Sequence, residues 1–185
     1  RGVKGAGSNT SWSQVLQSTG VPLNNVIAAR GCARIGYALK ADSTIWTWGD
    51  NVLLGNGTSL LNTDTAMQMT IPSGVTGIKM IQATRDDYFT NSVSYYLLAT
   101  NQQVYALGSN DYGQLGDRTT SDKLVWVNAR YPNNAIISNA AWISANEHDP
   151  SFPSFAVLNT SAQIFTCGYN SRYMAGRTTN NGINH

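Results

Sequence analysis

The 185-residue chain carries little charge. Only 12% of its residues are Asp, Glu, Lys or Arg, and 12 basic side chains stand against 10 acidic ones, for a formal net charge of +2. An ordinary soluble domain carries about 25% charged residues. Phosphate backbones are bound by clustered Lys and Arg, and the chain has neither a basic stripe nor a basic tail, so we expect no nucleic-acid partner.

Cysteine, histidine and long apolar runs are also scarce. Two cysteines, Cys32 and Cys167, are too few for a small scaffold built on disulfides. No apolar run approaches the roughly 20 residues that span a bilayer, so we expect no membrane insertion. The histidines are His148 and His185, and no Cys-x-x-Cys or His-x-x-x-His spacing occurs. We therefore expect no metal site.

Motifs for nucleophilic catalysis or nucleotide binding are missing as well. No Gly-x-Ser-x-Gly elbow occurs, and Gly5-Ala6-Gly7 lacks the third glycine and the following helix of a nucleotide-binding loop. The sequence thus predicts no catalytic residue, no cofactor and no enzymatic activity.

What the chain does contain favours strands. Glu occurs once, as Glu147, whereas Val, Ile, Thr, Tyr and Trp are plentiful. Hydrophobic residues make up 42% of the chain, which excludes a disordered protein. We interpret the fold as all-β. A surface rich in Asn, Thr and Ser is common on secreted, cell-surface and virion proteins, so we expect an extracellular, cell-surface or virion location.

One pattern that ends in a glycine occurs three times. The glycines are Gly49, Gly108 and Gly168, at a period of about 60 residues. Each glycine has a Leu ten residues before it, a β-branched residue four before, an aromatic residue three before and an Asn two after. These residues are Leu39, Leu98 and Leu158; Ile45, Val104 and Ile164; Trp46, Tyr105 and Phe165; and Asn51, Asn110 and Asn170. We expect the glycine to hold a conformation that other residues avoid, the aromatic residue to pack between repeats, and the Asn to hydrogen-bond its own loop.

Each period holds four short apolar segments, which is the signature of a propeller blade. Runs that end in Ala lie at residues 25–29, 79–83 and 141–145, and a further segment lies before each, at 12–16, 66–71 and 124–127. We predict a single partial β-propeller domain, 1–185. Its blades are expected at 12–58, 59–119 and 120–185, after the end of a preceding blade at 1–11.

Residues 38–51 followed by Leu54-Gly55-Asn56-Gly57-Thr58 resemble the regulator of chromosome condensation repeat, and residues 110–117 are close to its consensus. Residues 170–176 depart from it, since Tyr173, Met174 and Ala175 stand where Gly, Gln and Leu are usual. The resemblance implies a seven-bladed propeller, of which this chain supplies three four-stranded blades and is a divergent, partial member. We expect further sequence or other chains to supply the remaining blades, because an open blade face is a large apolar patch.

The second and third repeats carry extra residues at the same place in the blade. The inserted segments are Arg85-Asp86-Asp87-Tyr88-Phe89 and Glu147-His148-Asp149-Pro150-Ser151-Phe152. Equivalent places in adjacent blades share one propeller face, and loops on a rigid scaffold commonly carry recognition. We interpret these segments as a rim that binds a protein or a glycan. One alternative is that the insertions are sequence drift in solvent-exposed loops and have no function. Another is that Glu147 and His148 form an acid/base pair, although adjacent residues rarely face one target. The candidate binding residues are Arg85, Asp86, Asp87, Tyr88, Phe89, Glu147, His148, Asp149 and Phe152.

Three functions are compatible with these features. The first is a non-enzymatic binding or structural module outside the cell or on a virion. The second follows from the resemblance, whose nuclear members promote nucleotide exchange on a small GTPase and dock on chromatin; the missing basic cluster disfavours it. The third is an enzyme with its site at the propeller channel, which the lack of convergent titratable residues makes the weakest.

The two cysteines are predicted to be free thiols. Cys32 and Cys167 lie in different repeats, so a bond between them is not expected. Cys167 aligns with Trp48 and Leu107, which predicts a buried thiol that packs as a small apolar side chain.

Overall fold

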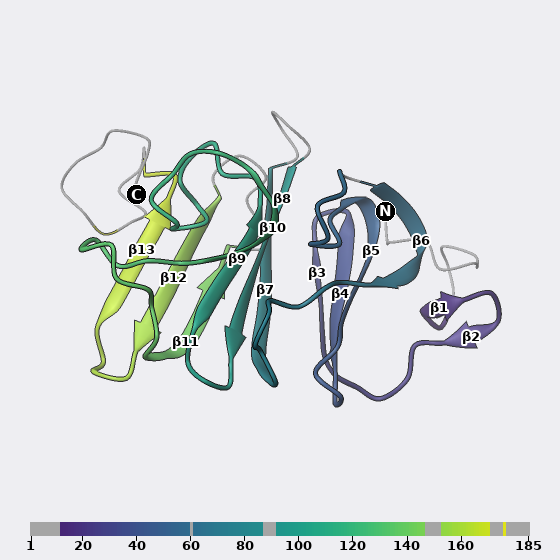
Figure 1. The fold of residues 1–185 in the computed structure, drawn as a ribbon. Helices are drawn as coiled ribbons and strands as arrows, with labels where there is room; N and C mark the ends of the chain where they lie inside the picture. The colour runs from purple at the N-terminus through teal and green to yellow at the C-terminus, as the bar shows by residue number, and fades with distance from the viewer. Residues whose placement is uncertain (1–11, 60, 87–91, 147–152, 171–175, 177–185) are drawn as a thin grey trace.

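The computed structural model describes residues 12–59, 61–86, 92–146, 153–170 and 176, and in these ranges it is all-β (Figure 1). The strands are β1 (Leu16–Ser18), β2 (Val21–Pro22), β3 (Val26–Cys32), β4 (Ile35–Lys40), β5 (Ile45–Val52), β6 (Leu61–Gln68), β7 (Ile78–Asp86), β8 (Ser92–Ala99), β9 (Val104–Gly108), β10 (Lys123–Asn128), β11 (Ala140–Ala145), β12 (Ser154–Asn159) and β13 (Ile164–Gly168). The predicted fold class is confirmed.

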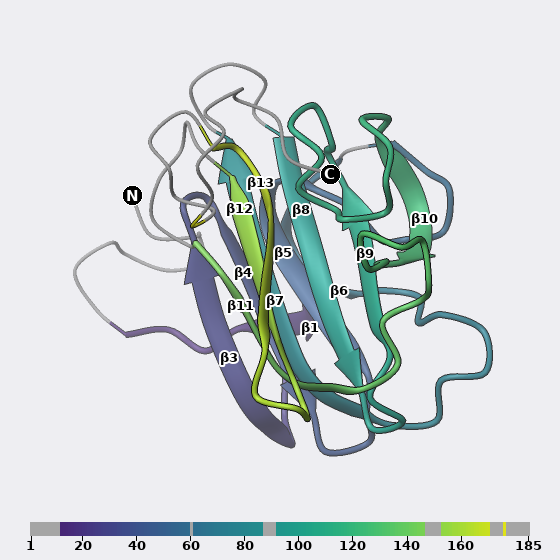
Figure 2. The same cartoon turned by 90° about the vertical axis from the view of Figure 1, so that its left-hand side faces the viewer.

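The strands form three antiparallel sheets that stand side by side, as propeller blades do. The first sheet has the order β3-β4-β5-β6, the second β7-β8-β9-β10 and the third β11-β12-β13, while β1 and β2 form a separate hairpin. Figure 1 shows the three sheets in a row, and Figure 2, viewed from the side of the third sheet, shows them one behind another. This arrangement is a partial β-propeller.

The hydrogen bonding corrects the predicted blade boundaries. The sequence pattern predicts residues 66–71 and 124–127 at the start of a blade. In the structure β6 pairs with β5, with Trp46 opposite Gln68, and β10 pairs with β9, with Tyr105 opposite Asn128. These strands therefore close the preceding sheet, so the first two sheets span residues 26–68 and 78–128. Residues 16–18 likewise pair with β2 and not with the first sheet.

Two apolar layers join the three sheets, and β8 contributes to both. Tyr95 and Leu97 pack into the layer between the first and second sheets. Tyr96 and Leu98 point the other way and pack into the layer between the second and third sheets. The ring of Tyr96 stacks on that of Phe155, with centroids 3.9 Å apart and planes at 6°. A strand that is buried on both faces shows no apolar–polar alternation, which explains the continuous apolar runs of the sequence.

The aromatic residues three positions before each repeat glycine pack between structural units, as predicted. Tyr105 is buried in the layer between the first and second sheets. Phe165 packs edge to face on Tyr131, with ring centroids 4.7 Å apart. Trp46 is partly buried against a smaller cluster that includes Leu23 from the N-terminal segment. The β1–β2 region thus covers part of the free side of the first sheet.

The third sheet has an exposed apolar face on the side away from the second sheet. Trp142 and Ile164 are 54% and 71% exposed. The residues at the equivalent positions of the second sheet are Met80, which packs against the layer next to the third sheet, and Val104, which is fully buried there. The exposed face of the third sheet therefore has the residue pattern of a buried inter-sheet layer.

Two adjacent buried phenols make the fold sensitive to alkali. Burial raises the pKa of Tyr95 and of Tyr96 well above its usual value. The Tyr95 hydroxyl lies 2.8 Å from the Thr47 hydroxyl, and the Tyr96 hydroxyl donates to the Gln114 carbonyl at 3.1 Å. These bonds suit neutral phenols, and the apolar surroundings leave a phenolate without water.

We expect stability to be lost at high pH. Because the folded-state pKa is raised, each phenol contributes its full stabilisation below the unfolded-state pKa of about 10 and loses it as the pH rises further. The free energy of unfolding should fall by up to about 1.4 kcal/mol per pH unit for each of the two tyrosines. Urea titrations between pH 8 and 11.5 measure this slope. Tyr95→Phe should reduce it, and tyrosinate absorbance appearing for all tyrosines near pH 10 in a chain that stays folded would contradict the prediction.

Candidate functional site

The two inserted segments begin side by side at one end of the sheets. One segment lies between the end of β7 at Asp86 and the start of β8, and the other lies between β11 and the start of β12 at Ser154. The Thr84 hydroxyl donates to the side-chain oxygen of Asn146 at 3.0 Å, and this oxygen also accepts the backbone N–H of Ser154 at 2.8 Å. The anchors of both insertions are therefore joined across adjacent sheets. We call this end of the molecule the loop face.

Most of the predicted rim residues lie outside the described residues. These are Asp87, Tyr88, Phe89, Glu147, His148, Asp149 and Phe152. Asp86 is the last residue of β7. The anchoring pair Thr84 and Asn146 is not among the residues predicted from the sequence, because two short polar side chains far apart in the chain carry no motif that would single them out.

Arg85 lies in a strand and not in the predicted loop. The sequence pattern assigns it to the inserted segment, but it lies within β7, opposite Val93 of β8. Its side chain is only 2% exposed, and its guanidinium donates to the backbone carbonyl of Asp50. Arg85 therefore links the second sheet to the first. The correction arises because β7 and β8 continue to pair beyond the length of the corresponding strands of the other sheets.

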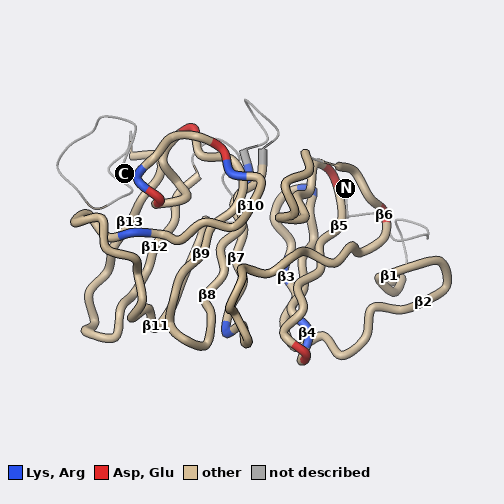
Figure 3. The backbone as a smooth tube through the Cα atoms, in the orientation of Figure 1, with Lys and Arg blue, Asp and Glu red and all other residues tan. Residues whose placement is uncertain are grey.

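Charged side chains of both signs lie at the loop face, and some of them pair with one another. Arg34 and Asp50 form an ion pair at 3.9 Å with both side chains more than half exposed, so it adds little stability. Figure 3 shows cationic and anionic positions next to one another at this end of the described backbone. A ligand of the loop face would meet charged groups of both signs as well as polar and aromatic groups.

A buried asparagine organises the loop that follows β9 on this face. The Asn110 side chain donates to Asp117 at 3.0 Å and to the Thr119 carbonyl at 2.8 Å, and it accepts the backbone N–H of Leu115 at 2.9 Å. Lys123 adds an ion pair to Asp117 at 3.4 Å. This confirms the prediction that the asparagine two residues after the repeat glycine bonds its own loop. The loop is thereby held in one conformation.

An aromatic pair links this loop to the third sheet. The rings of Tyr112 and Tyr169 pack edge to face with centroids 5.0 Å apart. Tyr169 directly follows the repeat glycine Gly168, and Tyr112 lies in the loop after the repeat glycine Gly108. The contact therefore joins corresponding segments of two neighbouring sheets. The base of the loop face is therefore braced between adjacent blades at two places, by polar groups at Thr84 and by rings at Tyr112.

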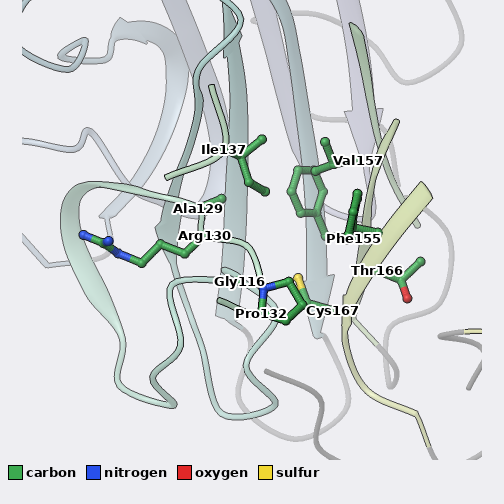
Figure 4. A pocket seen from close by; sticks show the side chains of 10 residues that line it. Gly116, Ala129, Arg130, Pro132, Ile137, Phe155, Val157, Thr166 and Cys167 are labelled. Carbon is green, nitrogen blue, oxygen red and sulfur yellow. The ribbon is translucent and has the colours of Figure 1, made fainter. Parts of the chain in front are cut away.

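A small cavity between the second and third sheets contains Cys167 (Figure 4). It measures about 30 Å³ and is lined by Gly116, Ala129, Arg130, Pro132, Ile137, Phe155, Val157, Phe165, Thr166 and Cys167. That volume suits one water molecule rather than a substrate. The Cys167 thiol lies 3.3 Å from the Gln114 carbonyl and donates to it. Cys32 and Cys167 are both buried thiols that form no disulfide, which confirms the interpretation of the two cysteines.

The described residues offer little chemistry for metal binding. No group of three or more His, Cys, Asp or Glu side chains comes together within those ranges. In the same part of the chain, no helix has the length and apolarity to cross a membrane. The phenols of Tyr95 and Tyr96, whose pKa values are raised, lie in packed layers and do not face a cleft.

Comparison with known proteins gives a likeness of fold. No protein-family model matches this sequence, and no curated protein matches it. Human WBSCR16 superimposes with a TM-score of 0.58 at 15% identity over 78% of this chain and 33% of its own. Saccharomyces cerevisiae Prp20p superimposes with a TM-score of 0.61 at 14% identity, over 88% of this chain and 37% of its own. Yeast RCC1 (Prp20), solved with Kap60 bound, superimposes with a TM-score of 0.59 at 14% identity, over 88% of this chain and 36% of its own.

These likenesses confirm an RCC1-like propeller fold, as the repeat pattern predicted. The chain spans about a third of the length of the solved structures that it matches. At such low identity the likeness concerns the fold, and a function has to be argued from the residues of this chain.

Proposed function

We propose that this chain is a non-enzymatic protein-binding propeller module that engages its partner across the loop face. The observation that carries the proposal is the hydrogen bond between Thr84 and Asn146, which joins the anchors of the two insertions across adjacent sheets. Two insertions whose anchors lie side by side on a braced scaffold can contact the same partner. A scaffold that is ordered before binding reduces the entropy cost of association.

The chemistry of the insertions fits a protein partner. Tyr88, Phe89 and Phe152 supply aromatic anchors, and Asp86, Asp87 and Asp149 supply polar contacts around them. Protein interfaces are enriched in aromatic residues at their centre and polar residues at their rim. The structural neighbours point the same way, since Prp20p binds Gsp1p and histones and yeast RCC1 binds Kap60. The weakly charged, Asn- and Thr-rich surface supports an extracellular, cell-surface or virion location.

Photo-crosslinking tests the proposal. A photoreactive amino acid placed at Tyr88 in the native producing cells should yield an adduct with one protein. The control carries the same amino acid at Ala41, an exposed position in the β4–β5 hairpin at the opposite end of the first sheet. The double variant Tyr88→Ala/Phe89→Ala should then bind the captured protein at least about 10-fold more weakly, with an unchanged melting temperature. Identical adducts from Tyr88 and Ala41, or none from Tyr88, would refute binding at this rim.

Regulation of a small GTPase is the second candidate, because one structural neighbour, Prp20p, binds Gsp1p and histones. It is tested directly by adding the chain to Gsp1p loaded with a fluorescent GDP. We expect the release rate to stay at its spontaneous value, since at 14% identity the likeness to Prp20p concerns the fold alone. Accelerated release would replace our proposal with this one.

We further propose that another sheet of the same kind packs on the exposed face of the third sheet, supplied by further sequence or by another chain. The support is the equivalence of Trp142 and Ile164 to the covered residues Met80 and Val104. A chain of residues 1–185 should therefore associate with increasing concentration in sedimentation velocity runs. Trp142→Ser/Ile164→Ser should weaken this association at least about 10-fold, because the buried apolar area is lost. Ile71→Ser, at a 42% exposed position after β6, should leave it unchanged, and a parent chain that stays monomeric would contradict the proposal.

A further inference from the structure

We propose that a cleft on the third sheet, at the end opposite the loop face, binds a neutral saccharide. The cleft has a volume of about 410 Å³ and lies between the turn after β10 and the β12–β13 hairpin. Its walls include two aromatic rings, Tyr131 and Phe165, and the amides of Asn133, Asn139 and Gln163. Figure 1 shows the β12–β13 hairpin at the lower end of the third sheet, away from the loop face.

The amides of the cleft present hydrogen-bond donors. The side-chain oxygen of Asn139 accepts the Tyr131 hydroxyl. The oxygen of Asn133 accepts the backbone N–H of Ala135 at 3.1 Å, and the oxygen of Gln163 accepts the Asn159 side-chain amide at 3.1 Å. Each amide oxygen thus accepts one hydrogen bond from the protein. Each amide therefore keeps its NH₂ donors and one oxygen lone pair for a ligand.

One wall of the cleft is a turn held in place by arginines. The backbone N–H of Tyr131 donates to the Ala135 carbonyl at 2.8 Å and closes the turn. Arg118 donates to the Pro132 carbonyl at 2.6 Å, and Arg130 donates to the Asn134 carbonyl at 2.9 Å. Both guanidinium groups therefore brace the backbone from outside the lining of the cleft. The ring of Tyr131 and the amide of Asn133 are positioned before any ligand arrives.

The opposite wall is an equally well-bonded hairpin. Asn159 is only 4% exposed, and its side-chain oxygen accepts the backbone N–H groups of Ser161 at 3.0 Å and Gln163 at 2.9 Å. Its NH₂ group then orients the Gln163 amide. Because both walls are ordered in advance, binding avoids the entropy cost of ordering them.

The chemistry of the lining selects the class of ligand. Amides that can both donate and accept favour a ligand whose groups do the same, as hydroxyl groups do. The described lining contains no Lys, Arg, Asp or Glu side chain, so an anion gains no ion pair there. The rings of Tyr131 and Phe165 form a partly buried apolar wall for a C–H surface. A neutral sugar combines ring and hydroxyl oxygens on its edge with an apolar C–H face, and it matches both walls.

The test uses an array of immobilised neutral oligosaccharides built from glucose, galactose, mannose and N-acetylglucosamine, printed beside their sulfated and sialylated forms. The full chain should be retained on at least one neutral member, with affinity then measured by calorimetry. Gln163→Ala removes one donor from an exposed position and should weaken binding about 3–10-fold. The matched control is Gln103→Ala, at the equivalent hairpin of the second sheet, where the Gln103 oxygen accepts the Tyr105 hydroxyl.

A second variant, Phe165→Leu, keeps an apolar side chain but removes the aromatic face, and it should weaken binding further without unfolding the chain. Retention of no neutral oligosaccharide would overturn the proposal. So would retention of the sulfated or sialylated forms alone, which would indicate recognition of anionic charge, or an equal loss of affinity in Gln163→Ala and Gln103→Ala. Because the loop face contributes no residue to this cleft, the result is independent of the crosslinking test at Tyr88.

Discussion

Replacing Gly108 with alanine is expected to cost at least about 3 kcal/mol of stability, and the chain is expected not to fold at 37 °C. Gly108 has a φ of +117°, in a region that residues with a Cβ rarely adopt. A Cβ there would stand 2.0 Å from the Val93 carbonyl oxygen and 2.9 Å from the Ser94 Cα. Both atoms belong to the backbone of the paired strand β8, so they cannot move aside without breaking the β8–β9 register.

The matched control is Gly74→Ala. Gly74 also has a positive φ, +81°, but a Cβ there would meet no atom within 4 Å. Its substitution should cost only the conformational strain, about 1–2 kcal/mol. Urea denaturation followed by circular dichroism measures both changes. Equal losses in the two variants would show that the contact with Val93 is relieved at little cost, and the explanation of the repeat glycine would then be wrong.

Asn110→Asp is expected to destabilise the chain by about 3–5 kcal/mol, although the two side chains have nearly the same shape. The Asn110 amide donates to Asp117 and to the carbonyls of Thr119 and Ser121, the last at 3.3 Å. A carboxylate at this fully buried position would face three acceptors and would stand beside a second carboxylate. The hydrogen bonds would be replaced by repulsion in surroundings that exclude water.

The control for this prediction is Asn51→Asp, at the equivalent position of the first sheet. Asn51 is partly exposed and has a φ of +54°, a conformation that Asp tolerates nearly as well as Asn. We expect a change within about 0.5 kcal/mol for this variant. Thermal unfolding of the two variants at pH 7 compares them. If Asn110→Asp unfolds at the parental temperature, the Asn110 network does not hold the loop, and the braced base of the loop face would have to be explained otherwise.

The features that the sequence could predict are those set by local backbone constraints. A glycine is required wherever the chain must leave a strand at large positive φ, and the same requirement at Gly49, Gly108 and Gly168 makes the repeat visible. In all three cases an added Cβ would lie within 2.4 Å of a backbone carbonyl oxygen in the paired strand or in the residue just before it. The buried bonding of Asn110 follows the same logic, because that side chain bonds residues of its own loop.

The positions of Arg85 and of the predicted rim illustrate where such reasoning ends. A count of extra residues between two apolar segments shows that an insertion exists. It does not show how far the flanking strands continue to pair before the loop begins. In the second sheet β7 and β8 remain paired as far as Asp86 and Ser92. Arg85 therefore lies within the strand, where its buried side chain donates to the Asp50 carbonyl.

The all-β class, the three repeats and the conformation of their glycines were thus determined by the sequence itself, because they depend on residues that are close together in the chain. Only the tertiary structure decided which sheet each fourth strand joins, since β6 and β10 could pair forward or backward and the choice depends on contacts between distant segments. The joining of the two insertion anchors through Thr84 and Asn146, and the amide-lined cleft at Gln163, likewise exist only once separate segments of the chain have packed together.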